Sequence, residues 1–232
     1  MLELGTRAQD QPLLWVDHVT HRLGGAGSTP VLRDVELVLA PGEWVALAGR
    51  SGSGKTTLCH LVAGMGTPTA GRILIDSVPA DRIEDWAVVS LLPQRLALAE
   101  ELSVAENLLL PLNLRARHGV GGAGGAGGAG RAGLGEQLIE TLGLAGLADR
   151  LVGQTSLGEQ QRTALGRALA LGPRLAVLDE PTGHQDDEHV DRVLAALSLV
   201  HERGTAILVA THDERMWRAA GRVLTIHEGQ LT

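Results

Sequence analysis

The chain has 232 residues, a formal net charge of −7 at pH 7 and a hydrophobic content of 44%. This length suits a single domain that can bury a sizeable core. The acidic balance argues against a nucleic-acid partner, because phosphate contacts need clustered Lys and Arg. One cysteine, Cys59, excludes an intrachain disulfide. No signal peptide and no membrane-spanning apolar run are predicted.

In chain order, apolar and β-branched runs predict strands at residues 13–19, 35–39, 44–48, 72–75, 87–92, 175–178, 206–210 and 223–227. Helical patterns occupy residues 56–63, 134–142, 159–171, 189–201 and 213–219. Strands that alternate with helices predict an α/β fold with a mostly parallel sheet. The strands before residue 44 lack intervening helices, which indicates an N-terminal antiparallel β subdomain.

The middle of the chain differs from both ends. Residues 95–155 lack strand signals, so we expect a helical subdomain within one domain that covers residues 1–232. Residues 119–130 repeat Gly-Gly-Ala. Such a segment has little side chain to bury, and we expect it to be a flexible loop.

The most specific motif is a phosphate-binding loop of the form G-x-x-x-x-G-K-[ST] between a predicted strand and a predicted helix. Its glycines let successive backbone N–H groups point at one anion, and the helix adds its positive N-terminal end. Lys55 can reach the β- and γ-phosphates of a nucleotide, and the Thr56 hydroxyl can ligate Mg²⁺. The residues predicted to bind the nucleotide are Gly49, Arg50, Ser51, Gly52, Ser53, Gly54, Lys55, Thr56 and Thr57.

Polar residues follow three other predicted strands. Asp179 and Glu180 end the run 175–178, His212 follows 206–210, and Gln94 follows 87–92. Beside a phosphate loop, Asp179 could hold Mg²⁺, Glu180 could polarise an attacking water, and His212 could donate to a γ-phosphate. The carbonyl of Gln94 could coordinate Mg²⁺. The alternatives are an acidic loop, a structural histidine and a solvated turn.

A helix start precedes the run 163–171. Ser156 is a natural N-cap, and Glu159 follows three residues later as in a capping box. This is either an ordinary helix start or an anion site at a helix N-terminus.

Taken in order, these motifs resemble the ATPase subunit of ATP-binding-cassette (ABC) transporters over nearly the whole chain. In this resemblance, residues 155–159 are the signature sequence, Glu180 is the catalytic base and His212 is the switch histidine. Residues 181–186 look like the D-loop, with Asp186 as its acid. The segments 64–71, 102–107 and 180–183 are similar to the lipoprotein-release and macrolide-export branch.

The resemblance implies a cytoplasmic-face, peripheral subunit that binds ATP and Mg²⁺, with Thr56, Gln94 and Asp179 as metal ligands. It implies a homo- or heterodimer with a second ATPase subunit, in which Ser156 and Gly158 contact the partner's γ-phosphate. It also implies a separate integral membrane permease subunit that docks beside Gln94 against the helical middle segment.

Two departures from the family pattern bear on activity. Thr155 and Leu157 stand where the signature has leucine and glycine. Leu23 stands where an aromatic side chain stacks on adenine, so weaker ATP binding is expected; His21 and Trp15 are the rings that could substitute.

Other classes remain as alternatives. A DNA-repair or chromosome-handling ATPase would carry a long coiled coil between Gln94 and Ser156, and a tandem ribosome-acting protein would carry a second phosphate loop. In a phosphate-loop kinase, the signature residues and His212 would have no role. A degenerate nucleotide-binding subunit with little hydrolysis is compatible with Leu157, although Glu180 and His212 are both present.

Overall fold

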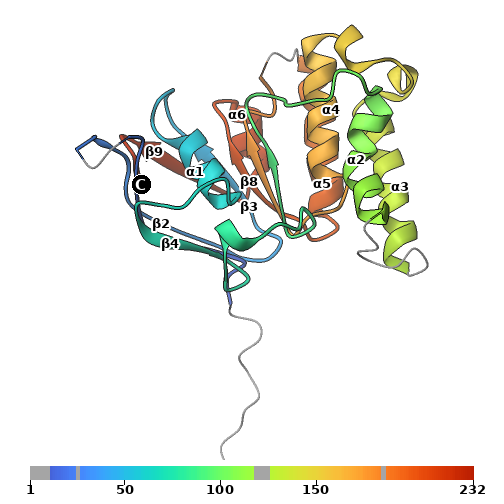
Figure 1. Cartoon of the computed structure of the whole chain (residues 1–232). Helices are drawn as coiled ribbons and strands as arrows, with labels where there is room; N and C mark the ends of the chain where they lie inside the picture. Colours follow the sequence, from blue (N-terminus) through green and yellow to red (C-terminus); the bar gives the residue numbers. More distant parts are fainter. Residues whose placement is uncertain (1–10, 25–26, 118–125, 184–186) are drawn as a thin grey trace, which may run out of the picture.

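Two sheets form the framework of the computed structural model, which describes residues 11–24, 27–117, 126–183 and 187–232 (Figure 1). Within these residues, an antiparallel sheet has the strand order β2-β1-β4-β5, and a six-stranded sheet has the order β10-β9-β3-β8-β7-β6. The first sheet consists of β1 (Leu14–Arg22), β2 (Pro30–Leu39), β4 (Ala70–Ile75) and β5 (Val78–Pro79). The second consists of β3 (Trp44–Ala48), β6 (Val89–Leu92), β7 (Leu175–Asp179), β8 (Ala206–Ala210), β9 (Arg222–His227) and β10 (Gln230–Leu231).

The predicted α/β fold and the N-terminal antiparallel sheet are therefore confirmed. Strands β6, β7, β8, β3 and β9 run parallel, and β10 pairs antiparallel with β9. The short strands β5 and β10 were not predicted, because two-residue strands carry too few side chains to show an alternating pattern.

The register of the parallel strands places their carboxyl ends level. Ala210 pairs with Leu47 on one side and with Asp179 on the other. The segments that follow β3, β7 and β8 therefore leave the sheet at one edge. These segments carry the phosphate loop, Glu180 and His212, and ligands of open α/β sheets bind at this edge.

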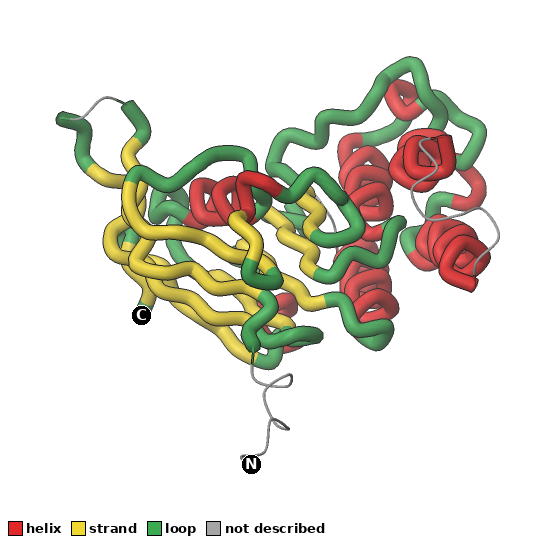
Figure 2. The backbone as a smooth tube through the Cα atoms, turned by 60° about the horizontal axis from the view of Figure 1, so that its bottom comes forward, coloured by secondary structure: helices red, strands yellow, loops and turns green. Residues whose placement is uncertain are grey.

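The helices pack on the larger sheet or stand beside it. In Figures 1 and 2, α2, α3 and α4 gather at the opposite end of the molecule from the antiparallel sheet. The helices are α1 (Lys55–Val62), α2 (Val104–Arg117), α3 (Ala126–Thr141), α4 (Leu157–Leu169), α5 (Asp187–His201) and α6 (Glu214–Ala219), with 3₁₀ turns at Ala80–Arg82, Ala145–Leu147 and Val152–Gln154.

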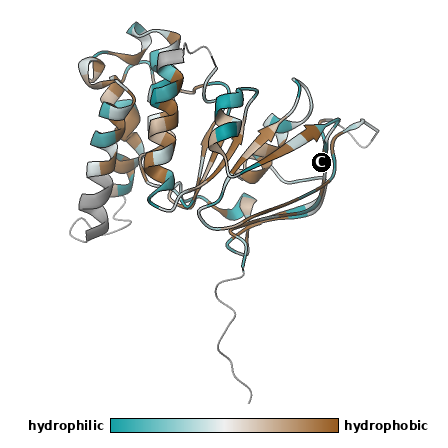
Figure 3. Cartoon of the chain, turned by 180° about the vertical axis from the view of Figure 1, so that it is seen from behind, coloured by the Kyte–Doolittle hydropathy of each residue, from teal (hydrophilic) through white to brown (hydrophobic). Residues whose placement is uncertain are grey.

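Buried apolar side chains form two clusters on the two faces of the parallel sheet. One joins the parallel sheet to the antiparallel sheet and α1, and includes Leu47 and Leu58. The other joins the parallel sheet to the helices, and includes Leu138, Leu165 and Ile207. Figure 3 shows the strands as predominantly hydrophobic. Burial on both faces explains why the parallel strands read as continuous apolar runs.

The prediction of a flexible loop over residues 119–130 is wrong for its last part. Helix α3 begins at Ala126, so residues 126–130 are helical; the rest of the repeat lies outside the described residues. Leu134, Leu138 and Leu142 are buried and anchor the end of this helix and the residue after it. Extending an anchored helix adds one hydrogen bond per ordered residue. The helix can therefore extend toward its N-terminus into glycine-rich residues that have a low helix propensity.

Across the described ranges, no helix is both long enough and apolar enough to cross a membrane.

Candidate active site

The phosphate loop closes around the ammonium group of Lys55. Lys55 Nζ donates to the carbonyl oxygens of Gly49 at 2.7 Å and Arg50 at 3.2 Å. Gly54 precedes α1 with φ of 110°, a left-handed conformation that favours glycine. No side chain caps the start of α1. The first N–H groups of this helix therefore have no side-chain cap, and the start of such a helix favours an anion.

Asp179 ends β7 as a buried carboxylate, with 1% of the residue exposed. Neither carboxylate oxygen has a hydrogen-bond partner of good geometry among the described residues. Burial raises the pKa of Asp179, and the nearby Thr56 hydroxyl offsets this only in part. A buried, unpaired carboxylate is unfavourable unless a cation or donor joins it. Together with the Thr56 hydroxyl, it offers the hard oxygen ligands that Mg²⁺ prefers.

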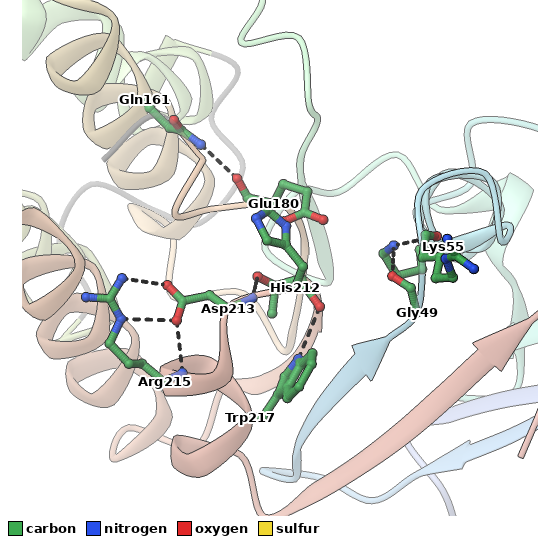
Figure 4. A network of polar contacts seen from close by, with 10 residues as sticks. Gly49, Lys55, Gln161, Glu180, His212, Asp213, Arg215 and Trp217 are labelled. Atoms are coloured by element: carbon green, nitrogen blue, oxygen red, sulfur yellow. Dashed lines mark hydrogen bonds and ion pairs between the residues drawn. The ribbon is translucent and has the colours of Figure 1, made fainter. Parts of the chain in front are cut away.

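Glu180 and His212 form a pair beside this carboxylate. Glu180 Oε2 lies 2.9 Å from His212 Nδ1. The backbone holds Glu180 in place: its N–H donates to the Ala210 carbonyl at 2.8 Å, and its own carbonyl accepts from Gln161 Nε2 at 2.7 Å. Figure 4 shows this pair facing Lys55 across the site.

Glu180 has φ of 53°, an uncommon angle for a residue with a side chain. Its side chain is 18% exposed, whereas that of His212 is 77% exposed. The carboxylate is therefore fixed and the imidazole is open to solvent, which suits a fixed base next to a side chain that meets a ligand.

The segment after His212 is anchored by hydrogen bonds that Figure 4 also draws. Asp213 caps α6 by accepting from the Arg215 backbone N–H at 2.9 Å. Burial acts to raise the pKa of Asp213, but the Arg215 hydrogen bonds outweigh it and the pKa is lowered. Trp217 Nε1 donates to the Thr211 carbonyl at 3.1 Å. These contacts fix the backbone on both sides of His212.

Helix α4 begins with a complete capping box. The Ser156 backbone N–H donates to Glu159 Oε2 at 2.7 Å, and the Glu159 N–H donates to Ser156 Oγ at 3.3 Å. The bond from the Ser156 backbone lowers the pKa of Glu159. Leu157 is the first residue of the helix and is 49% exposed. It has no positive φ, so leucine causes no backbone strain there.

A cavity of about 1210 Å³ joins most of the predicted residues. The whole phosphate loop, Thr57, Gln94, Asp179, Glu180 and His212 line it. Of the signature residues, Leu157 lines it, whereas Ser156 and Gly158 do not. Asp186 lies outside the described residues. The predicted site residues did not include several polar lining residues, among them Gln161, Thr182, Asp213 and Arg215.

The sequence carries a partial signal for Gln161, which is its position four residues before the apolar Leu165 on one helix face; its burial and its partner are seen only in the structure. It is a polar residue on a helix face that also carries Leu165, and it is only 6% exposed. A buried amide needs hydrogen-bond partners, and it finds one in the Glu180 carbonyl. Thr182 lies within the segment 181–186 that resembles the D-loop but was not predicted to line the site, and Arg215 carried no signal of its own.

Leu23 also lines the cavity, as the alignment of the adenine-stacking position predicts, and it is 63% exposed. The two suggested substitutes do not line it. Trp15 instead lies under the guanidinium of Arg72, 4.8 Å from ring centroid to Cζ. His21 is half-buried and absent from the cavity lining.

The comparisons with known proteins agree with this geometry. Residues 32–183 match the ABC transporter family. The chain is 35% identical over 227 residues to the lipoprotein-releasing system ATP-binding protein LolD of Hyphomonas neptunium, covering 94% of this chain and 95% of that protein.

Solved structures are similar as well. The dimeric, post-hydrolysis structure of the ATP-binding cassette MJ0796 bound to ADP and Pi has a TM-score of 0.81 and 28% identity, with 94% and 96% of the two chains covered. A structure described as an ATP-binding subunit of an ABC transporter has a TM-score of 0.79 and 26% identity, with 94% and 88% covered.

The chain therefore belongs to the ABC transporter family. Within that family it is an ATP-binding subunit with ATPase activity, and cassettes of this kind form dimers and work with membrane subunits.

Proposed function

We propose that the cavity binds ATP on the phosphate loop and hydrolyses it with Glu180 as the general base. The observation that carries this proposal is the fixed Glu180–His212 pair, which faces Lys55 across one cavity. Lys55 neutralises the β- and γ-phosphates. Glu180 accepts a proton from the attacking water, and His212 contacts the γ-phosphate as charge develops on it.

The residues present fit a magnesium ion. The carboxylate of Asp179, the Thr56 hydroxyl and the side-chain carbonyl of Gln94, which line one cavity, would supply the oxygen atoms to hold it. When bound, Mg²⁺ neutralises negative charge on the β- and γ-phosphates. The protein's own part is to keep the Asp179 carboxylate buried beside the Thr56 hydroxyl.

The chain works as one half of an ATPase pair on the cytoplasmic face of a membrane, bound to an integral permease subunit. The signature residues Ser156 and Gly158 lie outside the lining of this chain's own cavity, which supports a role toward a second subunit. The 35% identity to LolD over nearly the full length of both chains supports a permease of the lipoprotein-release type.

A membrane co-purification tests the whole assembly. A tagged Glu180→Gln form should retain uncleaved ATP and hold its partners together. In membranes supplied with ATP and Mg²⁺, it should co-purify with one integral membrane protein and a second ATPase subunit. Lys55→Ala, which lacks the phosphate contact, is the matched control and should recover the ATPase pair poorly. Recovery of the same partners at the same yield with Lys55→Ala contradicts ATP-driven pairing.

A further inference from the structure

The segment that connects β6 with α2 begins with Gln94, one of the proposed magnesium ligands. Residues 94–98 belong to no helix or strand, and within the described ranges they form no hydrogen bond to other backbone groups. Gln94 and Leu96 nevertheless line the same cavity as Asp179 and Thr56. A segment with so few backbone hydrogen bonds opens easily unless a side chain holds it.

Arg167 of α4 supplies that hold. Its Nη2 donates to the Leu96 carbonyl at 2.8 Å, and its Nη1 donates to the Ala97 carbonyl at 3.0 Å. Among the described residues, these are the only hydrogen bonds that reach residues 94–98. The side chains of Leu96 and Leu98 also pack against the apolar cluster that includes α4, but apolar contacts are non-directional. The guanidinium therefore fixes the orientation of this backbone.

The guanidinium of Arg167 has no other polar role in the part of the chain that the structure describes. It is half-buried, and burial lowers its pKa. No described carboxylate pairs with it. A partly buried cation without a counter-ion is unfavourable, so the two carbonyl oxygens are what compensates for its desolvation. Their adjacent positions suit the planar fork of a guanidinium, which binds both at once.

The backbone at Ala97 shows that the segment is constrained. Its φ is 46°, in the left-handed region that residues with a side chain uncommonly adopt. Such a conformation persists only where the surrounding structure imposes it. The Ala97 carbonyl is one of the two that Arg167 binds, so the guanidinium stabilises the bend just after Gln94.

We infer that Arg167 is a positioning residue for the magnesium ligand Gln94. By holding the two carbonyls that follow, it keeps the amide of Gln94 in the cavity with the Asp179 carboxylate and the Thr56 hydroxyl. The inference rests on the proposed magnesium site. Arg167 does not line the cavity, so it acts through Gln94 and not on the metal or the nucleotide. Removing a group that orients a metal ligand typically weakens metal binding by about 10- to 100-fold.

A spin label on the segment tests the tether without any metal. Arg95 is exposed and the chain's single cysteine, Cys59, is buried, so Arg95→Cys gives one accessible labelling site. Label mobility, measured by EPR in EDTA, should rise in Arg167→Met, whose side chain has no donor. Arg203→Met is the matched control and should not change it, because Arg203 Nη2 donates to Gln137 Oε1 at 2.6 Å away from the cavity lining. Equal mobility in wild type and Arg167→Met overturns the inference.

Mn²⁺ binding measures the consequence for the metal site. With the non-hydrolysable analogue AMP-PNP bound to the intact chain, the dissociation constant of Mn²⁺ should rise about 10- to 100-fold in Arg167→Met. Arg167→Lys keeps the charge but lacks the fork, and it should lie between wild type and Arg167→Met. Affinity for AMP-PNP in EDTA should be unchanged in both variants. Wild-type affinity for Mn²⁺ in both variants contradicts the positioning role.

The double variant Arg167→Met/Gln94→Ala shows whether Arg167 acts through Gln94. If it does, the double variant binds Mn²⁺ as Gln94→Ala alone does, because the ligand that Arg167 orients is already missing. Losses that add in the double variant mean that Arg167 supports the site by another route, and the inference is then wrong.

The single variant Gln94→Ala separates this inference from the proposed function. If Gln94→Ala binds Mn²⁺ as tightly as wild type, Gln94 is not a ligand; the proposed metal site loses that residue, and the inference falls with it. If Gln94→Ala weakens Mn²⁺ binding and Arg167→Met does not, the metal site stands and only the positioning role of Arg167 is wrong.

Discussion

Glu180 Oε2 lies 2.9 Å from His212 Nδ1, although the two residues are 32 positions apart in the chain. The pairing follows from the sheet. Asp179 at the end of β7 is the register partner of Ala210 at the end of β8, so the next residues of each strand leave the sheet together. The contact links the proposed base to the side chain proposed to meet the γ-phosphate, so that each influences the other's position.

Replacing Lys55 should impair ATP binding, whereas replacing Glu180 should impair hydrolysis. Lys55→Ala removes a charge-assisted phosphate contact, and ATP binding should weaken by about 10- to 100-fold. Glu180→Gln keeps the shape of the side chain but loses the base, so ATP should bind normally while turnover falls by about 10²- to 10⁴-fold. Equilibrium binding and single-turnover hydrolysis, measured with the membrane partner, separate the two effects. Normal turnover in Glu180→Gln would contradict the assignment of Glu180 as the general base.

His212→Ala should lower kcat far more than it weakens ATP binding. One hydrogen bond to a phosphate is strongest as charge develops, and losing such a donor lowers kcat by about 10²- to 10³-fold. His227→Ala is a suitable control, because His227 is exposed on β9 and does not line the cavity. Losses of equal size in affinity and in rate indicate instead that His212 is structural.

Asp179→Asn should stabilise the nucleotide-free protein while abolishing Mg²⁺-dependent hydrolysis. The carboxylate is buried without a hydrogen-bond partner of good geometry among the described residues, and a neutral amide of the same size removes the penalty of burying that charge. For a chain of this size, each kcal/mol of stabilisation raises Tm by about 2–4 °C. Thermal unfolding in EDTA measures the effect, and adding Mg·ATP should stabilise only the wild type. A lower Tm for the variant in EDTA contradicts the unpaired carboxylate.

The sequence predicted those parts of the fold whose local pattern agrees with their tertiary role. Strand β3 spans the predicted residues, and Asp179, Glu180 and His212 reach one edge because their parallel strands end level. The contact of Gln161 with the Glu180 carbonyl could not be predicted, because it joins a helix to the end of a strand. The helix at residues 126–130 was missed because Leu134 and Leu138 stabilise it from outside the repeat.

The capping box of α4 should make the protein's stability depend on pH through Glu159. Hydrogen bonds from Ser156 lower the pKa of Glu159 in the folded state. A lowered pKa means that the stabilisation is complete above the unfolded-state pKa and is lost as pH falls through the folded one. Glu159→Gln should therefore lower Tm slightly at pH 7, and the difference from wild type should shrink in acid. The effect is small because the site is open to solvent. If the Tm difference between wild type and Glu159→Gln grows as pH falls, the lowered pKa of Glu159 is not its cause.

Leu157 should weaken the half of the composite site that this chain presents to a second subunit. The leucine has no positive φ, so its effect arises from its bulk and not from backbone strain. A branched apolar side chain at the start of α4 obstructs the approach of a partner's phosphate to the helix N-terminus. Leu157→Gly should raise ATPase activity in a homodimer, where both composite sites improve, and only modestly in a heterodimer, where one site improves.

The same substitution should slightly lower Tm, because glycine within a helix is about 1 kcal/mol less favourable than alanine. Leu151→Gly is the matched control: Leu151 is 42% exposed, lies before the same helix and does not line the cavity. It should leave hydrolysis unchanged. ATPase activity and ATP-driven dimerisation, measured in the assembled transporter, show whether Leu157 weakens the composite site. If Leu157→Gly alters neither, then leucine is tolerated in this signature and the site facing the second subunit is fully active.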